Sequence, residues 1–126
     1  MDVEARLTLP GAVSAAGEAR RFVARTLTPT LGREDVETAV LVTSELVTNA
    51  VVHARSGCEV LLQGGPPTLT IRVSDPMPSG HRGRFPTIGR GLRLLEVLSR
   101  RWGVESGQHG KTVWCEISVR AGRGQA

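Results

Sequence analysis

The chain has 126 residues, which is the size of a single domain. Its residues are 40% hydrophobic and 22% charged, a balance that fits a globular protein and excludes a disordered tail. There is no tyrosine, and there are only two phenylalanines and two tryptophans, so the core must be aliphatic. The net charge of +4 permits nucleic-acid binding, but the aromatic side chains that stack on bases are almost absent.

Neither a membrane segment nor a metal site is expected. The longest aliphatic run, residues 39–42, is far shorter than the ~18 residues that suggest a membrane span. Charged residues interrupt the N-terminus, so we expect no signal peptide. Cys58 and Cys115 are isolated and lack metal-ligand spacing, which predicts two buried thiols in a cytoplasmic protein.

The first part of the chain predicts a strand and two helices. Residues 3–9 alternate in polarity and end at a Pro-Gly pair, which indicates a β-strand. Ser14 can cap a helix over residues 15–28, and a longer helix is predicted over residues 33–54. Apolar residues on that longer helix recur at steps of three and four and form one buried stripe. The stripe consists of Val36, Val40, Thr43, Val47, Ala50 or Val51, and Ala54.

A hairpin and a long loop follow. Two β segments, residues 59–63 and 68–73, are joined by Gly-Gly-Pro-Pro, which indicates a turn. Residues 75–91 then hold four glycines and three prolines without periodicity. Loops of this length in a compact domain commonly serve as lids or binding loops.

The last part predicts a helix over residues 92–101 and two strands, 102–105 and 112–119, before a frayed tail from residue 120. The strands come in hairpin pairs, and the βαβ alternation of a doubly wound nucleotide fold is missing. The order therefore favours an α/β (α+β) two-layer sandwich with a mostly antiparallel sheet.

The first candidate pair for chemistry is Glu45 with Asn49, one turn apart at the edge of the long helix's buried stripe. An amide oxygen is a hard donor suited to magnesium, and a carboxylate nearby can accept a proton or orient a nucleophile. Taken alone, the pair is more typical of an exposed Glu and an Asn bonded to a loop.

Two further candidates flank the long loop. Asp75 ends a β run, where its carboxylate can accept a hydrogen bond from an amine such as that of adenine, or can close an Asp-Pro turn. Gly89-Arg90-Gly91-Leu92 leads into a helix, where glycines let the backbone approach a phosphate. This spacing is neither a Walker loop nor a Rossmann fingerprint.

The fourth candidate is Gly110-Lys111-Thr112 at the start of the last strand, which also suits a hairpin turn. Thr112 offers a hydroxyl, and Lys111 is the only lysine in the chain. The three histidines are scattered and lack metal-ligand spacing, and no Ser/His/Asp order suggests a hydrolase.

Together and in this order, the four segments resemble the ATP-binding motifs of the GHKL superfamily, which includes gyrases and histidine kinases. The correspondences are residues 45–54 with the asparagine box, 73–76 with the first glycine box, 89–95 with the second and 110–114 with the third.

The resemblance runs from about residue 2 to 119, so we expect one histidine-kinase-like ATP-binding domain over residues 1–119. Its lid would be residues 76–88, and residues 120–126 would be a flexible basic tail. The resemblance implies the Bergerat fold, in which three helices cover one face of the sheet.

The most similar subgroup is the stand-alone anti-sigma factor serine/threonine kinase type, which is RsbW-like. We expect no histidine-bearing dimerisation helix before the domain, and a Trp102-Gly-Val box follows the third helix. Such proteins sequester a sigma factor and phosphorylate a serine on a STAS-domain antagonist, often as homodimers. The implied cofactors are ATP and Mg2+, and neither direct nucleic-acid binding nor a membrane is implied.

The resemblance also implies residue roles. Asn49 would coordinate the Mg2+ that bridges the ATP phosphates, and Glu45 would be the general base that activates the substrate hydroxyl. Asp75 would bind the adenine amine, and Thr112 would support the adenine end. The backbone that cradles the phosphates would be that of Gly89, Gly91 and Leu92.

One motif departs from the family pattern. The first glycine box normally reads Asp-x-Gly-x-Gly, but here Asp75 is followed by Pro-Met-Pro-Ser. Two prolines stiffen the start of the lid and remove backbone donors. A catalytically weak or inactive GHKL-fold binding module in a partner-switching pathway therefore stays an alternative. A third reading is a basic nucleic-acid binder that uses Arg20, Arg21, Arg25, Arg100 and Arg101.

Overall fold

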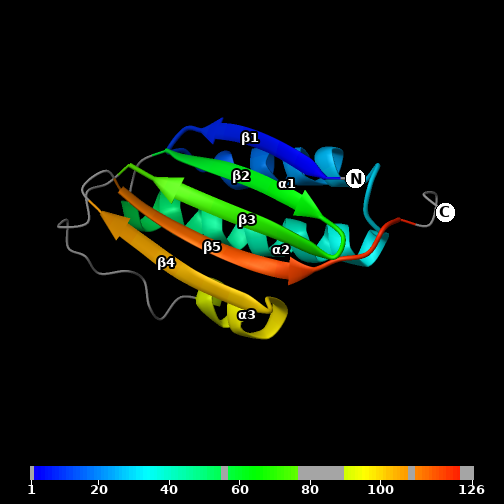
Figure 1. Ribbon diagram of the computed structural model, residues 1–126. Coiled ribbons are helices and arrows are strands. Elements are labelled where there is room, and N and C mark those ends of the chain that lie inside the picture. Colours follow the sequence, from blue (N-terminus) through cyan, green and yellow to red (C-terminus); the bar gives the residue numbers. More distant parts are fainter. Residues whose placement is uncertain (1, 55–56, 77–89, 108–109, 123–126) are drawn as a thin grey trace.

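The computed structural model describes residues 2–54, 57–76, 90–107 and 110–122 (Figure 1). Every helix and strand predicted from the sequence is present. In chain order they are β1 (Val3–Leu9), α1 (Ala15–Leu27), α2 (Arg33–Asn49), the π-helical η1 (Ala50–Ala54), β2 (Cys58–Gly65), β3 (Thr68–Asp75), α3 (Arg90–Leu98), β4 (Arg101–Gly107) and β5 (Gly110–Ser118).

The five strands form one sheet in the order β1-β2-β3-β5-β4, and every neighbouring pair is antiparallel. The three α-helices lie together on one face of this sheet, with α2 between α1 and α3 (Figure 1). The predicted two-layer α+β sandwich is therefore confirmed.

Alternation along the strands separates a buried face from an open one. Leu69, Ile71 and Val73 of β3 are buried against the helices, as are Val113 and Cys115 of β5. Successive side chains of a strand leave on opposite sides, so the residues between them lie on the open face.

Charged pairs occupy that open face. Arg6 contacts Glu59 at 3.0 Å, and Arg72 contacts Glu105 at 3.6 Å. The Arg101 guanidinium lies 5.7 Å from the centre of the Trp114 ring. Because the ion pairs are substantially exposed, each contributes at most about 1 kcal/mol to stability.

The core is aliphatic, as the composition requires. On α1 the buried residues Ala15, Ala19, Val23 and Leu27 recur every four positions and form one stripe. Ser14 holds the predicted N-cap position, but its backbone is already helical and its side chain makes no capping hydrogen bond.

The long helix differs from the sequence prediction at its end. Residues 33–54 were expected to form one α-helix, whereas the α-helix ends at Asn49 and the next five residues wind as a π-helix. A π-helical turn is wider than an α-helical one and is commonly found at functional sites. The predicted stripe is buried at its centre, where Thr43 and Val47 are fully inaccessible.

The chain also continues past the point where the sequence predicted a tail. Ala121 forms a β-bridge with Leu31, and the Gly122 N–H donates to the Thr30 carbonyl at 3.1 Å. Residues 120–122 are therefore tied to the α1–α2 connection by backbone hydrogen bonds, which the sequence pattern does not reveal.

Candidate functional site

The predicted site segments meet at one end of the sheet. At that end α2 finishes, β3 finishes and β5 begins (Figure 1, left). The π-helical segment after Asn49 packs against both α2 and β3. The structure therefore brings the asparagine-box helix and the first and third glycine boxes into one region.

Glu45 and Asn49 are half-buried on one flank of α2. The neighbouring Ser44 hydroxyl accepts a hydrogen bond from Arg20 at 3.1 Å, so the flank that carries Ser44 faces α1. Each residue turns an α-helix by about 100°, which places Glu45 and Asn49 on the flank turned away from α1. On that side α2 packs against α3 (Figure 1).

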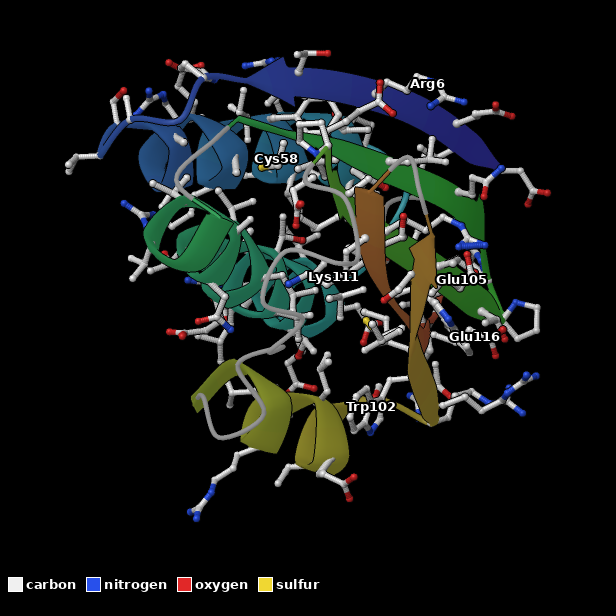
Figure 2. The ribbon with its side chains drawn as sticks, turned by 90° about the vertical axis from the view of Figure 1, so that its left-hand side faces the viewer. Arg6, Cys58, Trp102, Glu105, Lys111 and Glu116 are labelled. Atoms are coloured by element: carbon white, nitrogen blue, oxygen red, sulfur yellow. The ribbon has the colours of Figure 1, made fainter. Side chains whose placement is uncertain are left out.

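Asp75 is the last residue of β3 and is only 6% exposed. In the β3–β5 register it lies directly opposite Lys111. Both line a small cavity of about 240 Å3 at the β4–β5 hairpin, which Ser74, Glu105 and Thr112 also line. Figure 2 shows the Lys111 side chain between α2 and the sheet, on the same side as Cys58.

Gly110 allows the end of β3 and the start of β5 to lie close together. Its φ of +130° lies in the region that favours glycine, and a Cβ at this position would approach the Asp75 carbonyl oxygen to 2.1 Å. The strand that carries Asp75 can therefore lie against the start of β5 only because residue 110 has no side chain.

The two thiols are buried and protonated at neutral pH. Burial raises the pKa of Cys58 from 9.0 to about 11, and the negative charge of Asp75 adds to the effect. Burial likewise raises the pKa of Cys115 to about 12, with a further contribution from Glu116. Cys58 is thus a neutral, largely apolar neighbour of Asp75, and neither thiol is a nucleophile at neutral pH.

Thr112 lies on the other face of the sheet from Asp75. Its Oγ1 is 2.7 Å from Ser74 Oγ, and Ser74 is its partner in the strand register. Its side-chain contact with β3 is therefore through Ser74 on the open face, while Lys111 shares the covered face with Asp75.

In the sequence, Lys111 stands out only as the single lysine, and its place on the same face as Asp75 was not predicted. The signal was present in the alternation of the last strand. Val113 and Cys115 are apolar residues that face the helices, and counting back by two from them reaches Lys111.

The second glycine box is only partly described. Gly89 lies outside the described residues, as do residues 77–88 of the predicted lid. Gly91 and Leu92 belong to the first turn of α3, which begins at Arg90. The first N–H groups of a helix have no partner within the helix and are suited to phosphate, so this position is compatible with the predicted role of their backbone.

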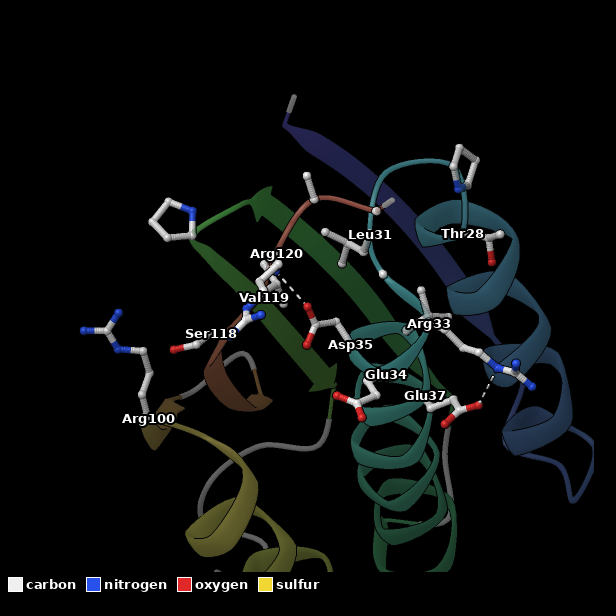
Figure 3. Close-up of a pocket in the computed structure, with 16 residues that line it drawn as sticks. Thr28, Leu31, Arg33, Glu34, Asp35, Glu37, Arg100, Ser118, Val119 and Arg120 are labelled. Carbon is white, nitrogen blue, oxygen red and sulfur yellow. Dashed lines mark hydrogen bonds and ion pairs between the residues drawn. The ribbon is translucent and has the colours of Figure 1, made fainter. Parts of the chain in front are cut away.

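A larger cavity, of about 1500 Å3, lies at the other end of the molecule (Figure 3). It is formed by the α1–α2 connection, the start of α2 and the segment after β5. The Asp35 carboxylate accepts a hydrogen bond from the Arg120 N–H at 2.7 Å there. None of the predicted site residues lines this cavity, so size alone does not identify the candidate site.

The described residues hold neither a ready-made metal site nor a helix that could span a membrane. They contain no cluster of three or more His, Cys, Asp or Glu side chains able to hold a metal. A Mg2+ ion that accompanies a nucleotide does not need such a cluster, because phosphate oxygens and water supply most of its ligands. The half-buried Asn49 amide therefore fits the predicted role. Within the described part of the chain, each helix is too short or too polar to cross a membrane.

The five arginines of the nucleic-acid reading do not form one patch. Arg20, Arg21 and Arg25 lie on α1, which packs beneath the edge strand β1. Arg100 and Arg101 lie at the start of β4, the opposite edge of the sheet. The binding surface that this reading requires is therefore divided between the two sides of the molecule.

Comparison with known proteins identifies the family. The sequence matches the histidine kinase-like ATPase domain over residues 9–117. This chain therefore belongs to the histidine kinase-like ATPase family, as the four motifs predicted. A search of curated proteins found no significant match.

A solved structure has the same fold. The crystal structure of the RsbU and RsbW domains of Rv1364c from Mycobacterium tuberculosis matches with a TM-score of 0.75 and 22% sequence identity. The match covers 93% of this chain and 32% of that chain, so the present chain spans about a third of its length. At this identity the likeness shows the fold.

Proposed function

We propose that this chain is an ATP-binding regulatory serine/threonine kinase of the anti-sigma factor type. It would phosphorylate a STAS-domain antagonist and sequester a sigma factor in the cytoplasm. The observation that supports this most is that α2, which carries Asn49, and β3, which carries Asp75, finish at the same end of the sheet (Figure 1) in a histidine kinase-like ATPase domain. A solved structure that includes an RsbW domain and shares the fold supports the anti-sigma type.

The proposed roles follow from chemistry. The buried Asp75 carboxylate is an acceptor that suits the adenine amine. The Asn49 amide oxygen would hold Mg2+ together with the nucleotide phosphates, and Mg2+ would neutralise their charge when bound. Glu45, one turn before Asn49, would accept the proton of the substrate hydroxyl.

Nucleotide binding is tested by thermal unfolding with ATP or ADP, with and without magnesium. A ligand at 100 times its Kd adds about 2.7 kcal/mol of stability, which raises the Tm by several degrees at this size. We expect Asp75→Asn to abolish the shift with either nucleotide and Asn49→Ala to abolish only its magnesium-dependent part. The absence of any shift at millimolar nucleotide would refute ATP binding.

Phosphate transfer is a separate test. Radiolabelled ATP is incubated with the protein and a STAS-domain substrate, and label on the substrate is measured. Glu45→Gln should bind ATP but lose at least about 100-fold in transfer rate, since this is the usual contribution of a general base. Glu37→Gln, an exposed position two turns earlier on the same helix, is the matched control and should retain activity.

The second candidate function is an inactive binding module, and the altered first glycine box favours it. Pro76 directly follows β3, and a proline cannot donate the backbone hydrogen bond that a residue there would otherwise offer. A protein that binds ATP, captures a STAS partner and transfers no label would establish this alternative.

A further inference from the structure

We propose that β1 is an interaction surface for a second copy of this chain, and that two copies pair antiparallel along their β1 strands about a two-fold axis at Ala5. The inference goes beyond the proposed function and does not depend on nucleotide binding. It rests on three features of this edge of the sheet, which are an unprotected backbone, a half-buried apolar row and a pair of complementary charges.

The backbone of β1 lacks the usual protection of an edge strand. Among the described strands β1 pairs with β2 alone, and no other described strand lies beyond it (Figure 1). All seven of its residues are in regular register with β2, without a bulge, and none of them is glycine or proline. Edge strands of natural proteins are commonly very short, bulged or interrupted by proline, which prevents pairing with another chain. The outer edge of β1 is therefore suited to accept a further strand.

The opposite edge of the sheet is less suited to pairing. β4 has Gly103 in its interior and Gly107 at its end. Glycine within a strand weakens the strand, because it adds backbone entropy and has no side chain to pack. Of the two edges, β1 is thus the one whose sequence favours strand pairing.

The covered face of β1 carries an apolar row that one copy buries only in part. Val3, Ala5 and Leu7 pack against the core, and each is half-buried. Directly opposed residues of antiparallel strands point to the same side of the sheet, so a second β1 would continue this row. Removing the remaining apolar surface from water favours association.

The open face of β1 carries two opposite charges, Glu4 and Arg6, two positions apart. Arg6 contacts Glu59 at 3.0 Å, and both of these side chains are substantially exposed. Its guanidinium has five N–H donors, so it can also serve a second carboxylate. Glu4 forms no ion pair or side-chain hydrogen bond with another described residue. A partner for Glu4 is therefore free to come from another chain.

These charges favour one symmetric register. With the two-fold axis at Ala5, Glu4 of each copy lies opposite Arg6 of the other. The same axis places Val3 opposite Leu7 on the covered face. An axis at Glu4 or at Arg6 would place like charges directly opposite each other, which is destabilising. A shift by a single residue would turn the apolar row to the open face.

The first experiment is sedimentation velocity of the purified protein over a range of concentrations. A contact between two strands is small for a protein interface, so we expect a weak dimer with a Kd of about 10–100 μM. Glu4→Arg and Arg6→Glu each place like charges opposite one another in the dimer. Either variant should raise the Kd of dimerisation by at least about tenfold.

A mixture of these two variants tests the charge pairing directly. In a dimer of one Glu4→Arg copy with one Arg6→Glu copy, the two positive side chains of the first face the two negative side chains of the second. The mixture should therefore dimerise with a Kd within about tenfold of the wild-type value, although neither variant does so alone. Glu105→Arg reverses a charge on the other edge strand and is the matched control. It should leave the dimer unchanged.

An engineered disulfide tests the register. The axis at Ala5 places the two Cβ atoms of this residue about 5 Å apart, close to the separation that a disulfide spans. Ala5→Cys should therefore link two copies under oxidising conditions, whereas Cys58 and Cys115 are buried and should stay reduced. Thr8→Cys lies on the same strand and should form no such link, since the two copies of Thr8 would be about 20 Å apart.

Three results would overturn the inference. A wild-type protein that is monomeric at about 500 μM refutes it and leaves this edge to a strand of another protein. Variants that fold by circular dichroism but do not dimerise when mixed refute the pairing of Glu4 with Arg6. Loss of the wild-type dimer in Glu105→Arg would assign the interface to β4. None of these results bears on nucleotide binding, which is measured separately.

Discussion

Thr43 and Asp75 are the buried polar residues in the described part of the chain, and their surroundings differ. Asp75 lies at the end of a strand and lines a cavity. Thr43 lies inside the apolar stripe of α2, and its hydroxyl has no hydrogen-bond partner. A buried hydroxyl without a partner costs about 1–3 kcal/mol of stability. Removing the Thr43 hydroxyl is therefore expected to stabilise the protein.

Replacing Thr43 by valine should stabilise the protein by about 1 kcal/mol, because the shape is kept and the unpaired hydroxyl is removed. Urea unfolding followed by circular dichroism measures the change. The same substitution at Thr48, which is exposed on the same helix, should change the free energy of unfolding by less than about 0.5 kcal/mol. A destabilised Thr43→Val protein would show that the hydroxyl has a partner after all.

Gly110→Ala should destabilise the protein by about 2 kcal/mol or more, because φ is +130° and the added Cβ would meet the Asp75 carbonyl. It should also weaken nucleotide binding, since Asp75 must shift. Gly107→Ala is the matched control in the same hairpin, because no atom lies within 4 Å of its Cβ position. Equal free energies of unfolding for the two variants would contradict the close approach at Gly110.

Among the elements, the start of α2 and the segment after β5 depend on each other. Figure 3 shows the Asp35 side chain directed at the Arg120 backbone, to which it is hydrogen-bonded at 2.7 Å. The Leu31–Ala121 bridge lies beside this contact. One carboxylate thus joins the start of α2 to the segment after β5, which is distant in sequence.

Asp35→Ala should release this segment and cost about 1 kcal/mol of stability. The Arg120 amide should then exchange its hydrogen with solvent faster, which hydrogen-exchange mass spectrometry or NMR detects. Glu34→Ala removes a carboxylate from the same helical turn, and so the same interaction with the helix dipole. Unchanged exchange at residues 120–122 in Asp35→Ala would show that the β-bridge alone holds the segment.

The periodicity of apolar residues predicted the helices and strands well. Where it failed, at the end of α2 and after β5, the reasons are physical. Alternation placed β1 at residues 3–9, and three-and-four spacing placed α1 and the start of α2. The π-helical segment after Asn49 packs against β3, and no sequence period encodes the change of winding. The contacts of residues 120–122 with the α1–α2 connection are made by backbone atoms, so no side-chain pattern predicts them.

The same limits apply to the candidate site. Motif order predicted that the asparagine-box helix and the first and third glycine boxes lie in one region (Figure 1), because the resemblance supplied a fold. It singled out Thr112, which lines the same cavity as Asp75 but lies on the open face, whereas Lys111 lies on the covered face. The face of a residue at a strand start depends on register with its neighbours, and that register was unknown until the strands were paired.

At the scale of the whole molecule, pH acts on stability through the two thiols. In the unfolded chain they lose their protons near pH 9.0, whereas their pKa values in the folded protein are about 11 for Cys58 and about 12 for Cys115. The folded state therefore holds more protons above pH 9, and stability falls as pH rises through that range. Below pH 9 this contribution is fully present.

Urea unfolding between pH 8 and pH 10.5 should show most of this decline, which for Cys58 reaches about 3 kcal/mol once the pH exceeds its folded-state pKa of about 11. The chain has no tyrosine and one lysine, so few other groups titrate there. Replacing both cysteines by alanine should lower stability at pH 8 but flatten the profile. A wild-type profile as flat as that of the double variant would contradict the assignment to the thiols.

The β3–β5 pairing also has a consequence for how the chain folds. The β2–β3 and β4–β5 pairs are hairpins between neighbours in sequence, whereas β3 and β5 are separated in the chain by α3 and β4. Closing such a long loop costs entropy before any contact compensates for it, so we expect this pairing to form late. Asp75 and Lys111 face each other only after it forms. Nucleotide should accordingly slow unfolding in stopped-flow experiments and leave the refolding rate unchanged, whereas faster refolding with ADP would mean that the pocket exists before the transition state.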